Sequence, residues 1–433
     1  MLALFDAYDD ATKELMRSLA TAGVAVTPVI IQYDGELPDG ALCPFVTYTG
    51  IARTGRPLFF NEVPIPPWCE IRQGRESYGE IRHDGGVVGR INYEPNSFRQ
   101  VESVDWLLPD GTVGHTDHYD RYGTRYATTH YSGGTAYQTV YQGPGEWAIE
   151  IDHVSRLVTM RSQSALFAFE TLTDFVSHFI DDQQLSDDRI LINSLSHPLF
   201  VARRRAAEPN TILFWQEPLR GEPPGNMAAE LEEPRSLTGI VFCDERVQRK
   251  VAAQYPETPV RLSYLSHLGQ FADKHGYDPQ RVFTLTNTDQ IPALAELLEA
   301  FPDVTFSVAA LTLMSEKLHE LGSRHANLTL VPRITQGGIR EELDKASVYL
   351  DINAGAHVLD VVKAAYYLGL VVLALAPHAK APDHSRVLET PDELKAQLAA
   401  AVSAPEGRAA ALDELHTQRG PVSTVEDYRR VFD

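Results

Sequence analysis

Basic residues are scarce in this chain. Lys and Arg together number 38 among 433 residues, against 59 Asp and Glu, so the formal net charge is −21 at pH 7. Nucleic-acid phosphates demand a basic surface, so this balance argues against nucleic-acid binding and against direct attraction to anionic lipid. The negative charge fits a solubilising surface or a neutral or basic polypeptide partner, and charge alone names neither.

Cysteines and long apolar runs are also few. Cys43, Cys69 and Cys243 form an odd set without CxxC spacing, which predicts a reducing, cytoplasmic setting. No apolar run is long enough to span a bilayer. Residues 1–10 carry no basic region and turn acidic at once, so we expect no secretory signal there.

Signatures of catalysis are missing too. The sequence contains neither GxSxG nor a phosphate-binding P-loop. His115, Asp117 and His118 look like metal ligands, but alternation along a strand puts His118 on the opposite face, and no third ligand is apparent. We therefore predict no catalytic residue, no metal site and no cofactor.

The hydrophobic pattern changes period along the chain. A helix at 9–22 and a strand at 24–31 open an α/β pattern, which short alternating segments then interrupt. The α/β pattern resumes with a helix at 164–180 and continues into a second α/β unit. The expected parts are a first Rossmann-like domain at 1–48 and 152–270, an inserted antiparallel β-meander at 49–151, a second Rossmann-like domain at 271–418 and a C-terminal helix at 419–433.

The segment 347–376 reads as a buried strand, a tight turn, a short helix and a second buried strand. Ligands of open α/β sheets bind beyond the strand C-termini, so the turn faces a potential site. The segment resembles the sugar-donor loop of two-domain retaining glycosyltransferases, in which two glutamates eight residues apart contact the donor. When Gly369 is matched to the glycine after the helix, the glutamate positions fall on Ala356 and Ala364, and both carboxylates are gone.

A nucleotide diphosphate at such a site also needs a neighbouring cation. The loop at 282–289 offers hydroxyls, an acid and the Asn287 amide, but no cation. Arg333 and Lys363 lie nearby without the spacing of a phosphate clamp, and we interpret them as ordinary solvated charges. The sequence thus predicts a degenerate donor site at Ala356, Ala364 and Asn287.

Several segments, in the same order over nearly the whole chain, resemble the accessory Sec system glycosylation chaperone of Gram-positive bacteria. That family is the non-catalytic subunit of the O-GlcNAc transferase for serine-rich-repeat adhesins. The segments are 60–66, 106–113, 117–123, 212–218, 224–227 and 285–290.

This resemblance implies the glycosyltransferase B architecture, a pair of Rossmann-type domains with a β-meander inserted in the first half. It implies a catalytic O-GlcNAc transferase subunit as partner, two copies of each subunit, and UDP-GlcNAc as the donor that the complex uses. It further implies unglycosylated serine-rich-repeat adhesin as substrate and a cytoplasmic location that allows peripheral association with the membrane.

Two places are candidates for acceptor binding. Trp215, Gln216 and Glu217 end a predicted central strand and should point into the interdomain cleft, with Asn226 in the loop or helix that follows. An aromatic face, an amide and a carboxylate suit a hydroxyl-rich peptide. The alternative is that Trp215 packs in the core and Glu217 caps a helix.

The second place is a predicted hairpin around Tyr119 and Arg121, which either braces the sheet or contacts an extended peptide by β-augmentation. Two other functions compete with the substrate-binding chaperone: an active retaining glycosyltransferase with altered donor contacts, and an assembly subunit that never touches substrate.

Overall fold

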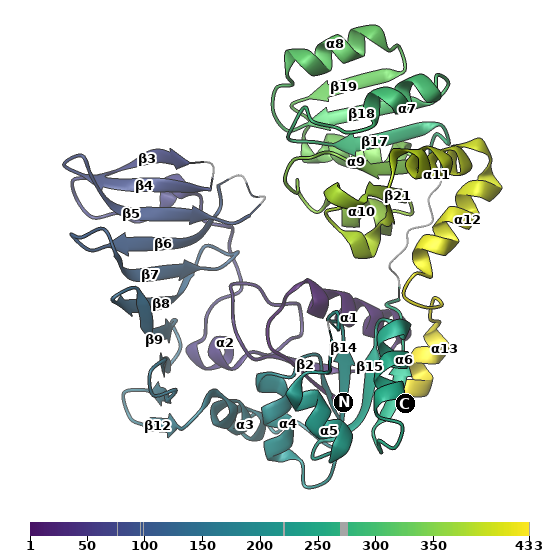
Figure 1. The fold of residues 1–433 in the computed structure, drawn as a ribbon. Coiled ribbons are helices and arrows are strands. Elements are labelled where there is room, and N and C mark those ends of the chain that lie inside the picture. Colours follow the sequence, from purple (N-terminus) through teal and green to yellow (C-terminus); the bar gives the residue numbers. More distant parts are fainter. Residues whose placement is uncertain (76, 96, 98, 220, 269–275, 433) are drawn as a thin grey trace. The chain divides into compact units, whose positions relative to one another are not determined.

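The structure is a computed structural model that describes residues 1–75, 77–95, 97, 99–219, 221–268 and 276–432. The chain forms two compact units (Figure 1). Unit 1 comprises Met1–Ser266 and Thr424–Asp433, and unit 2 comprises His267–Ser423. Within the described ranges, no helix combines the length and the apolar composition that crossing a bilayer requires.

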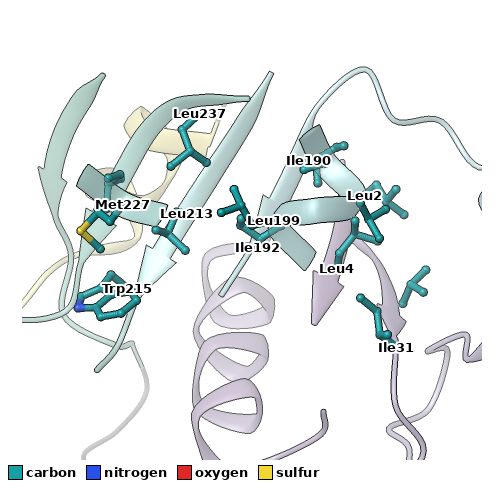
Figure 2. Close-up of a cluster of buried hydrophobic side chains, with 14 of the residues drawn as sticks. Leu2, Leu4, Ile31, Ile190, Ile192, Leu199, Leu213, Trp215, Met227 and Leu237 are labelled. Carbon is teal, nitrogen blue, oxygen red and sulfur yellow. The ribbon is translucent and has the colours of Figure 1, made fainter. Parts of the chain in front are cut away.

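Unit 1 contains a six-stranded parallel sheet in the order β16-β15-β14-β13-β1-β2. Its inner strands are almost wholly apolar because helices cover both faces of such a sheet. Figure 2 shows part of the resulting core, with Leu2 and Leu4 from one strand and Leu213 from another. The strands are β1 (Leu2–Phe5), β2 (Thr27–Ile30), β13 (Ile190–Ile192), β14 (Thr211–Trp215), β15 (Leu237–Phe242) and β16 (Arg261–Tyr264).

The helices of unit 1 follow its strands and include the end of the chain. The last helix, α13, belongs to this unit: Tyr428 donates to the Ser266 carbonyl at 3.0 Å, and Arg189 donates to the Phe432 carbonyl at 2.7 Å. The helices are α1 (Asp10–Ala22), α2 (Pro44–Thr49), α3 (Leu172–Asp182), α4 (His197–Arg205), α5 (Gly225–Glu232), α6 (Glu245–Gln254) and α13 (Val425–Phe432).

Helix α1 has defined ends. Asp9 is its N-cap and accepts from the Thr12 amide at 2.9 Å, which satisfies one of the first free N–H groups. Gly23 ends it with φ of 72°, a left-handed conformation that glycine adopts without a Cβ clash. Helix α1 begins shortly after the C-terminal end of β1.

A ten-stranded antiparallel sheet is inserted between β2 and α3, and its strands pair in simple sequence order. Two of the strands, β11 and β12, lie beyond Ile151. The strands are β3 (Cys69–Arg75), β4 (Tyr78–His83), β5 (Gly86–Tyr93), β6 (Val101–Leu107), β7 (Val113–Tyr119), β8 (Arg125–Ser132), β9 (Thr135–Gln142), β10 (Ala148–Asp152), β11 (Val158–Arg161) and β12 (Leu166–Phe169).

The helix predicted at 164–180 is wrong in its first turns. Leu166 to Phe169 pair with β11 as a strand, and the Ser162 backbone amide closes the hairpin by donating a hydrogen bond to the Ala165 carbonyl at 2.8 Å. Thr171 then caps α3 by accepting from the Asp174 amide at 3.2 Å. Pairing with the preceding strand outweighs the helix-like spacing of the apolar residues here.

Unit 2 is a second parallel sheet, in the order β19-β18-β17-β20-β21-β22. Two parallel sheets with an antiparallel sheet inserted in the first half confirm the predicted fold class. The strands are β17 (Arg281–Leu285), β18 (Thr305–Ala310), β19 (Leu328–Pro332), β20 (Val348–Asp351), β21 (Val371–Leu375) and β22 (Arg386–Leu388). The helices are α7 (Leu294–Ala300), α8 (Glu316–Arg324), α9 (Gln336–Lys345), α10 (Val361–Tyr367), α11 (Pro391–Ser403) and α12 (Pro405–His416).

Candidate functional site

Polar residues follow the strands at the C-terminal edge of the unit 1 sheet, where open α/β sheets bind ligands. Asp6, just after β1, accepts from the Gln32 amide at 3.2 Å and from the Ser194 hydroxyl at 3.3 Å. Gln216, just after β14, donates to the Ala11 carbonyl in the first turn of α1 at 2.8 Å. The Asp6 bonds link the segments that follow β1, β2 and β13, and the Gln216 bond fastens the start of α1 to the end of β14.

The same edge opens into a cleft of about 790 Å³, which we call the acidic cleft. The α1 end of the sheet forms one wall and the antiparallel sheet forms the other. Seven carboxylates and two cations line it, so its net charge is strongly negative. The lining residues are Tyr8, Asp9, Asp10, Ala11, Lys13, Asp34, Gly35, Glu36, Pro57, Glu94, Gln100, Val101, Glu102, Tyr119, Asp120 and Arg121.

Both cations of the acidic cleft contact one carboxylate. Lys13 lies 2.9 Å from Glu36 and above the Tyr8 ring, and Arg121 forms an ion pair with the same Glu36. The other carboxylates therefore leave an excess of negative charge. Partial burial, followed by the neighbouring carboxylate of Glu102, raises the pKa of Glu94.

The turn between β7 and β8 braces this cleft. Asp120, 2% exposed, accepts from the Tyr122 and Thr124 amides at 3.0 and 2.8 Å, which shapes the turn. The Tyr33 hydroxyl donates to the same carboxylate at 3.4 Å, and the Arg121 amide donates to the Gly35 carbonyl at 3.2 Å. The hairpin thus fastens the antiparallel sheet to the loop after β2, and Tyr119 and Arg121 also line the cleft.

Trp215 lies in the core of unit 1, and only 4% of it is exposed. Figure 2 shows its ring beside Met227, and its indole N–H has no partner in the part of the chain that the structure describes. The interpretation of Trp215 as an open stacking face is therefore wrong, and the core alternative holds. A strand that is covered on both faces buries even its last residue.

The neighbours of Trp215 differ from it. Gln216 reaches Ala11 on the wall of the acidic cleft, and Glu217 is exposed. Helix α5 has Pro224 as its N-cap, so Glu217 is not the cap of that helix. Asn226 donates to the Leu195 carbonyl at 3.2 Å. The structure thus brings Tyr119 and Arg121 to one cleft, whereas Trp215, Gln216, Glu217 and Asn226 are outside its lining and Gln216 contacts it only through Ala11.

Sequence reasoning did not identify the carboxylates of the acidic cleft as a site. Asp9 and Asp10 follow the first strand, and Asp34 and Glu36 follow the second, so acids placed directly after parallel strands were the available signal. Glu94 and Glu102 come from the antiparallel sheet, and only the tertiary fold brings them there.

Strand β7 holds the residues weighed as metal ligands. Asp117, 5% exposed, accepts from the Trp106 indole at 3.0 Å and the Thr128 hydroxyl at 2.7 Å. His118 lies 2.9 Å from the Thr129 hydroxyl. Among the described residues, no group of three metal-ligating side chains comes together. These contacts link neighbouring strands of the sheet.

In unit 2, the segments after β17 and β20 contain the residues that the sequence assigns to a degenerate donor site. Ala356 is exposed in the loop after β20, and Ala364 lies in α10. Asn287 closely approaches the second loop, because a Cβ added to Gly355 would lie 2.0 Å from its side-chain oxygen. Arg333 is exposed in a loop after β19.

One cation at this edge was not predicted from the sequence. Lys380, in the loop after β21, lies 3.3 Å from the Asp351 carboxylate at the end of β20. It lies far along the sequence from the loop at 282–289, so nothing in the sequence placed it at this edge. The edge therefore does contain a cation, but that cation is already paired with an acid.

Family comparisons cover most of the chain. Four family models match: GtfB N-terminal domain over residues 2–48, GtfB middle domain over 69–170, GtfB third domain over 172–253, and GftB/GlyA-F C-terminal domain over 282–413.

Individual relatives agree with these matches. The UDP-N-acetylglucosamine–peptide N-acetylglucosaminyltransferase stabilizing protein GtfB of Streptococcus gordonii is 33% identical over 381 residues, covering 86% of this chain and 84% of that protein. A chain of a crystal structure of the GtfA/B complex bound to UDP and GlcNAc superposes with a TM-score of 0.89 at 30% identity, covering 100% of this chain and 99% of that one.

A more distant likeness shows the fold alone. The pneumococcal O-GlcNAc transferase GtfA in complex with UDP and GlcNAc is 11% identical with a TM-score of 0.55, covering 100% of this chain and 98% of that one. The fold is thus glycosyltransferase-B-like. With this identity to a GtfB protein over most of both sequences, the chain belongs to the GtfB family of stabilising proteins.

Proposed function

We propose that this chain is the non-catalytic, substrate-binding and stabilising subunit of a protein O-GlcNAc transferase that modifies Ser/Thr-rich adhesins before export. In this proposal the active partner is a GtfA-like subunit, two copies of each chain form the complex, and UDP-GlcNAc is the donor that the partner uses. The name and complex of the GtfB relatives support this assignment.

One observation supports the proposed absence of transferase chemistry. A transferase needs groups that stabilise the charge developing at the donor. Alanines stand at both expected carboxylate positions, Ala356 and Ala364, and Lys380 at the same edge is engaged by Asp351. A chain that keeps the transferase fold without these groups gains a function most simply by pairing with an active relative.

We place acceptor binding in unit 1, at the acidic cleft and the adjoining strand end. Tyr119 and Arg121 line one wall, Gln216 supports the other through Ala11, and Glu217 is exposed next to it. An unstructured Ser/Thr-rich chain loses conformational entropy on binding, so many weak hydrogen bonds along an extended surface suit it better than one deep pocket.

The proposed location is the cytoplasm, with peripheral association at the inner face of the membrane. This part rests on the resemblance to the accessory Sec chaperones and on the unpaired spacing of the cysteines. A fractionation of cells followed by a high-salt wash of the membranes tests it, since peripheral association is released by salt.

A transfer assay tests the catalytic part of the proposal. Radiolabelled UDP-GlcNAc and a Ser/Thr-rich peptide are incubated with this chain, with the catalytic subunit, and with both. We expect no transfer by this chain alone and faster transfer by the pair than by the catalytic subunit. Robust transfer by the isolated chain would instead favour an active retaining glycosyltransferase.

A binding assay separates substrate recognition from assembly. Tyr119→Ala should weaken capture of unglycosylated adhesin, whereas Tyr137→Ala, an exposed tyrosine of the same sheet outside the cleft, should not. Both variants should still form the complex. If the wild-type complex captures no adhesin through this chain, the subunit is purely structural.

A further inference from the structure

The β17/β20 boundary is the place in unit 2 where the strand order reverses, because β17 pairs with β18 on one side and β20 on the other. Sheets of this kind bind nucleotide phosphates in the crevice beyond the strand ends at such a boundary. We call this place the switch-point crevice and define it by Leu285, Asn287 and the turn from Asn353 to Gly355.

The protein's own groups bridge the switch-point crevice. Asn353, 3% exposed, donates from its side chain to the Leu285 carbonyl at 3.2 Å and accepts from the Gly355 amide at 3.2 Å. The Ala354 amide donates to the Gln290 carbonyl at 2.9 Å. Two of these hydrogen bonds hold the loop after β20 onto the end of β17 and the loop that follows it, and the third, from Gly355 to Asn353, shapes the loop after β20.

Lys380 holds the same loop from the other side. Its ammonium lies 3.3 Å from an Asp351 oxygen and also donates to the Asn353 carbonyl, while its backbone amide donates to the second Asp351 oxygen at 2.6 Å. The two side chains are 10% and 1% exposed. Two charges this poorly hydrated depend on each other, because an unpaired buried charge is costly.

We propose that the Asp351–Lys380 pair seals the switch-point crevice, which is a latent diphosphate site closed by the protein's own ammonium group. The Asp351 carboxylate repels an incoming anion and occupies the cation that the anion would need. Removing the carboxylate charge leaves one buried positive charge beside two backbone loops, which is an environment that attracts a phosphate. This inference concerns unit 2 and does not depend on acceptor binding in unit 1.

Lysine labelling of the wild-type chain is the first test. An amine-reactive ester followed by peptide mass spectrometry compares Lys380 with Lys317, which is exposed on α8. Lys380 should react roughly tenfold or more slowly, because its reaction requires local opening. Equal rates at the two lysines would show that Lys380 seals nothing. This measurement needs no variant, so it stands even if a substitution prevents folding.

Pyrophosphate binding by an isosteric variant is the second test. Calorimetry with inorganic pyrophosphate, and separately with UDP, compares wild type, Asp351→Asn and the double variant Asp351→Asn/Lys380→Met. We expect no binding by wild type, a gain of at least about tenfold in pyrophosphate affinity for Asp351→Asn, and loss of this gain in the double variant.

Thermal unfolding of the same three proteins gives a second readout. Asp351→Asn should unfold at a lower temperature than wild type, and pyrophosphate should raise its melting temperature selectively, because a ligand stabilises the state that it binds. The proposal is overturned if wild type binds pyrophosphate or UDP as tightly as the variant, or if Asp351→Asn gains nothing. Transferase activity of the isolated chain would refute the proposed function while leaving these binding results to judge the seal separately.

Discussion

Replacement of Trp215 by alanine separates a core role from a binding role at the end of β14. The side chain is 4% exposed and packs with Met227 and Leu213 in the unit 1 core (Figure 2). Truncation removes a large buried aromatic and leaves a cavity, which typically costs about 3–5 kcal/mol. We therefore expect Trp215→Ala to lower the free energy of unfolding of unit 1 by that amount.

Tryptophan fluorescence during urea titration is a selective assay. All four tryptophans of the chain lie in unit 1, so the signal reports this unit without interference from unit 2. Trp215→Phe is the matched control. It keeps most of the apolar volume and removes the indole N–H that has no partner among the described residues. Its free energy of unfolding should therefore fall by less than about 1.5 kcal/mol.

The opposite pattern would refute the core assignment. If the free energy of unfolding of Trp215→Ala lies within about 0.5 kcal/mol of wild type, as it does for ordinary surface substitutions, the side chain is not packed as described. If the same variant also loses adhesin affinity, Trp215 is a binding residue after all. A combined Trp215 and Gln216 replacement is a poor binding test, since the core would be damaged first.

Stability, acceptor charge and assembly give three further predictions. Glu230→Gln should lose about 3–5 kcal/mol in the same urea titration, because fully buried Glu230 accepts from Arg203 at 2.6 Å and from three backbone amides. Burial raises the pKa of the Glu230 carboxyl, but these donors together lower it by more, so the net shift is downward. Wild type should therefore keep the stabilisation from Glu230 above about pH 4.3 and lose it as the pH falls through the lowered folded pKa. The variant should show no such loss of stability in acid. Calorimetry should show that acceptor peptides with added lysines bind more tightly than the unmodified peptides at low salt but not at about 0.5 M salt. Glu102→Gln in the acidic cleft should reduce this gain in affinity, and Glu70→Gln outside the cleft should not. Co-expression with the catalytic subunit, followed by size-exclusion light scattering, should give equal numbers of the two chains, and separate elution would contradict the assembly.

Local pattern predicts elements well where one period dominates. The central strand predicted to end around Trp215 is Thr211–Trp215 in the structure, because a continuous apolar run flanked by polar residues admits few alternatives. The helix predicted at 164–180 is wrong in its first turns because Leu166–Phe169 pair with Val158–Arg161. Helical spacing of apolar residues does not reveal such a pairing partner. Strand pairing is a tertiary property.

Site residues follow the same division. Because Gln216 follows a predicted strand, the sequence predicted that it lies near a ligand-binding edge. Its side chain does reach the start of α1. Which way Trp215 points depends on the helices that cover the sheet, so the sequence left both orientations open. Lys380 lies far along the chain from Asn287, and only the parallel order of β17, β20 and β21 brings their loops to one edge.

The two parallel sheets use the same kind of edge in opposite ways. In unit 1, the residues after the strands face an open cleft whose carboxylates exceed its cations. In unit 2, Asn353 and Lys380 bind the neighbouring loops, so the corresponding crevice is bridged by hydrogen bonds and an ion pair. An edge whose Asn353 and Lys380 are already engaged by the protein offers fewer contacts to a ligand, whereas an open, charged cleft beside a half-buried tyrosine offers many weak contacts. This contrast is the physical reason to seek acceptor recognition in unit 1.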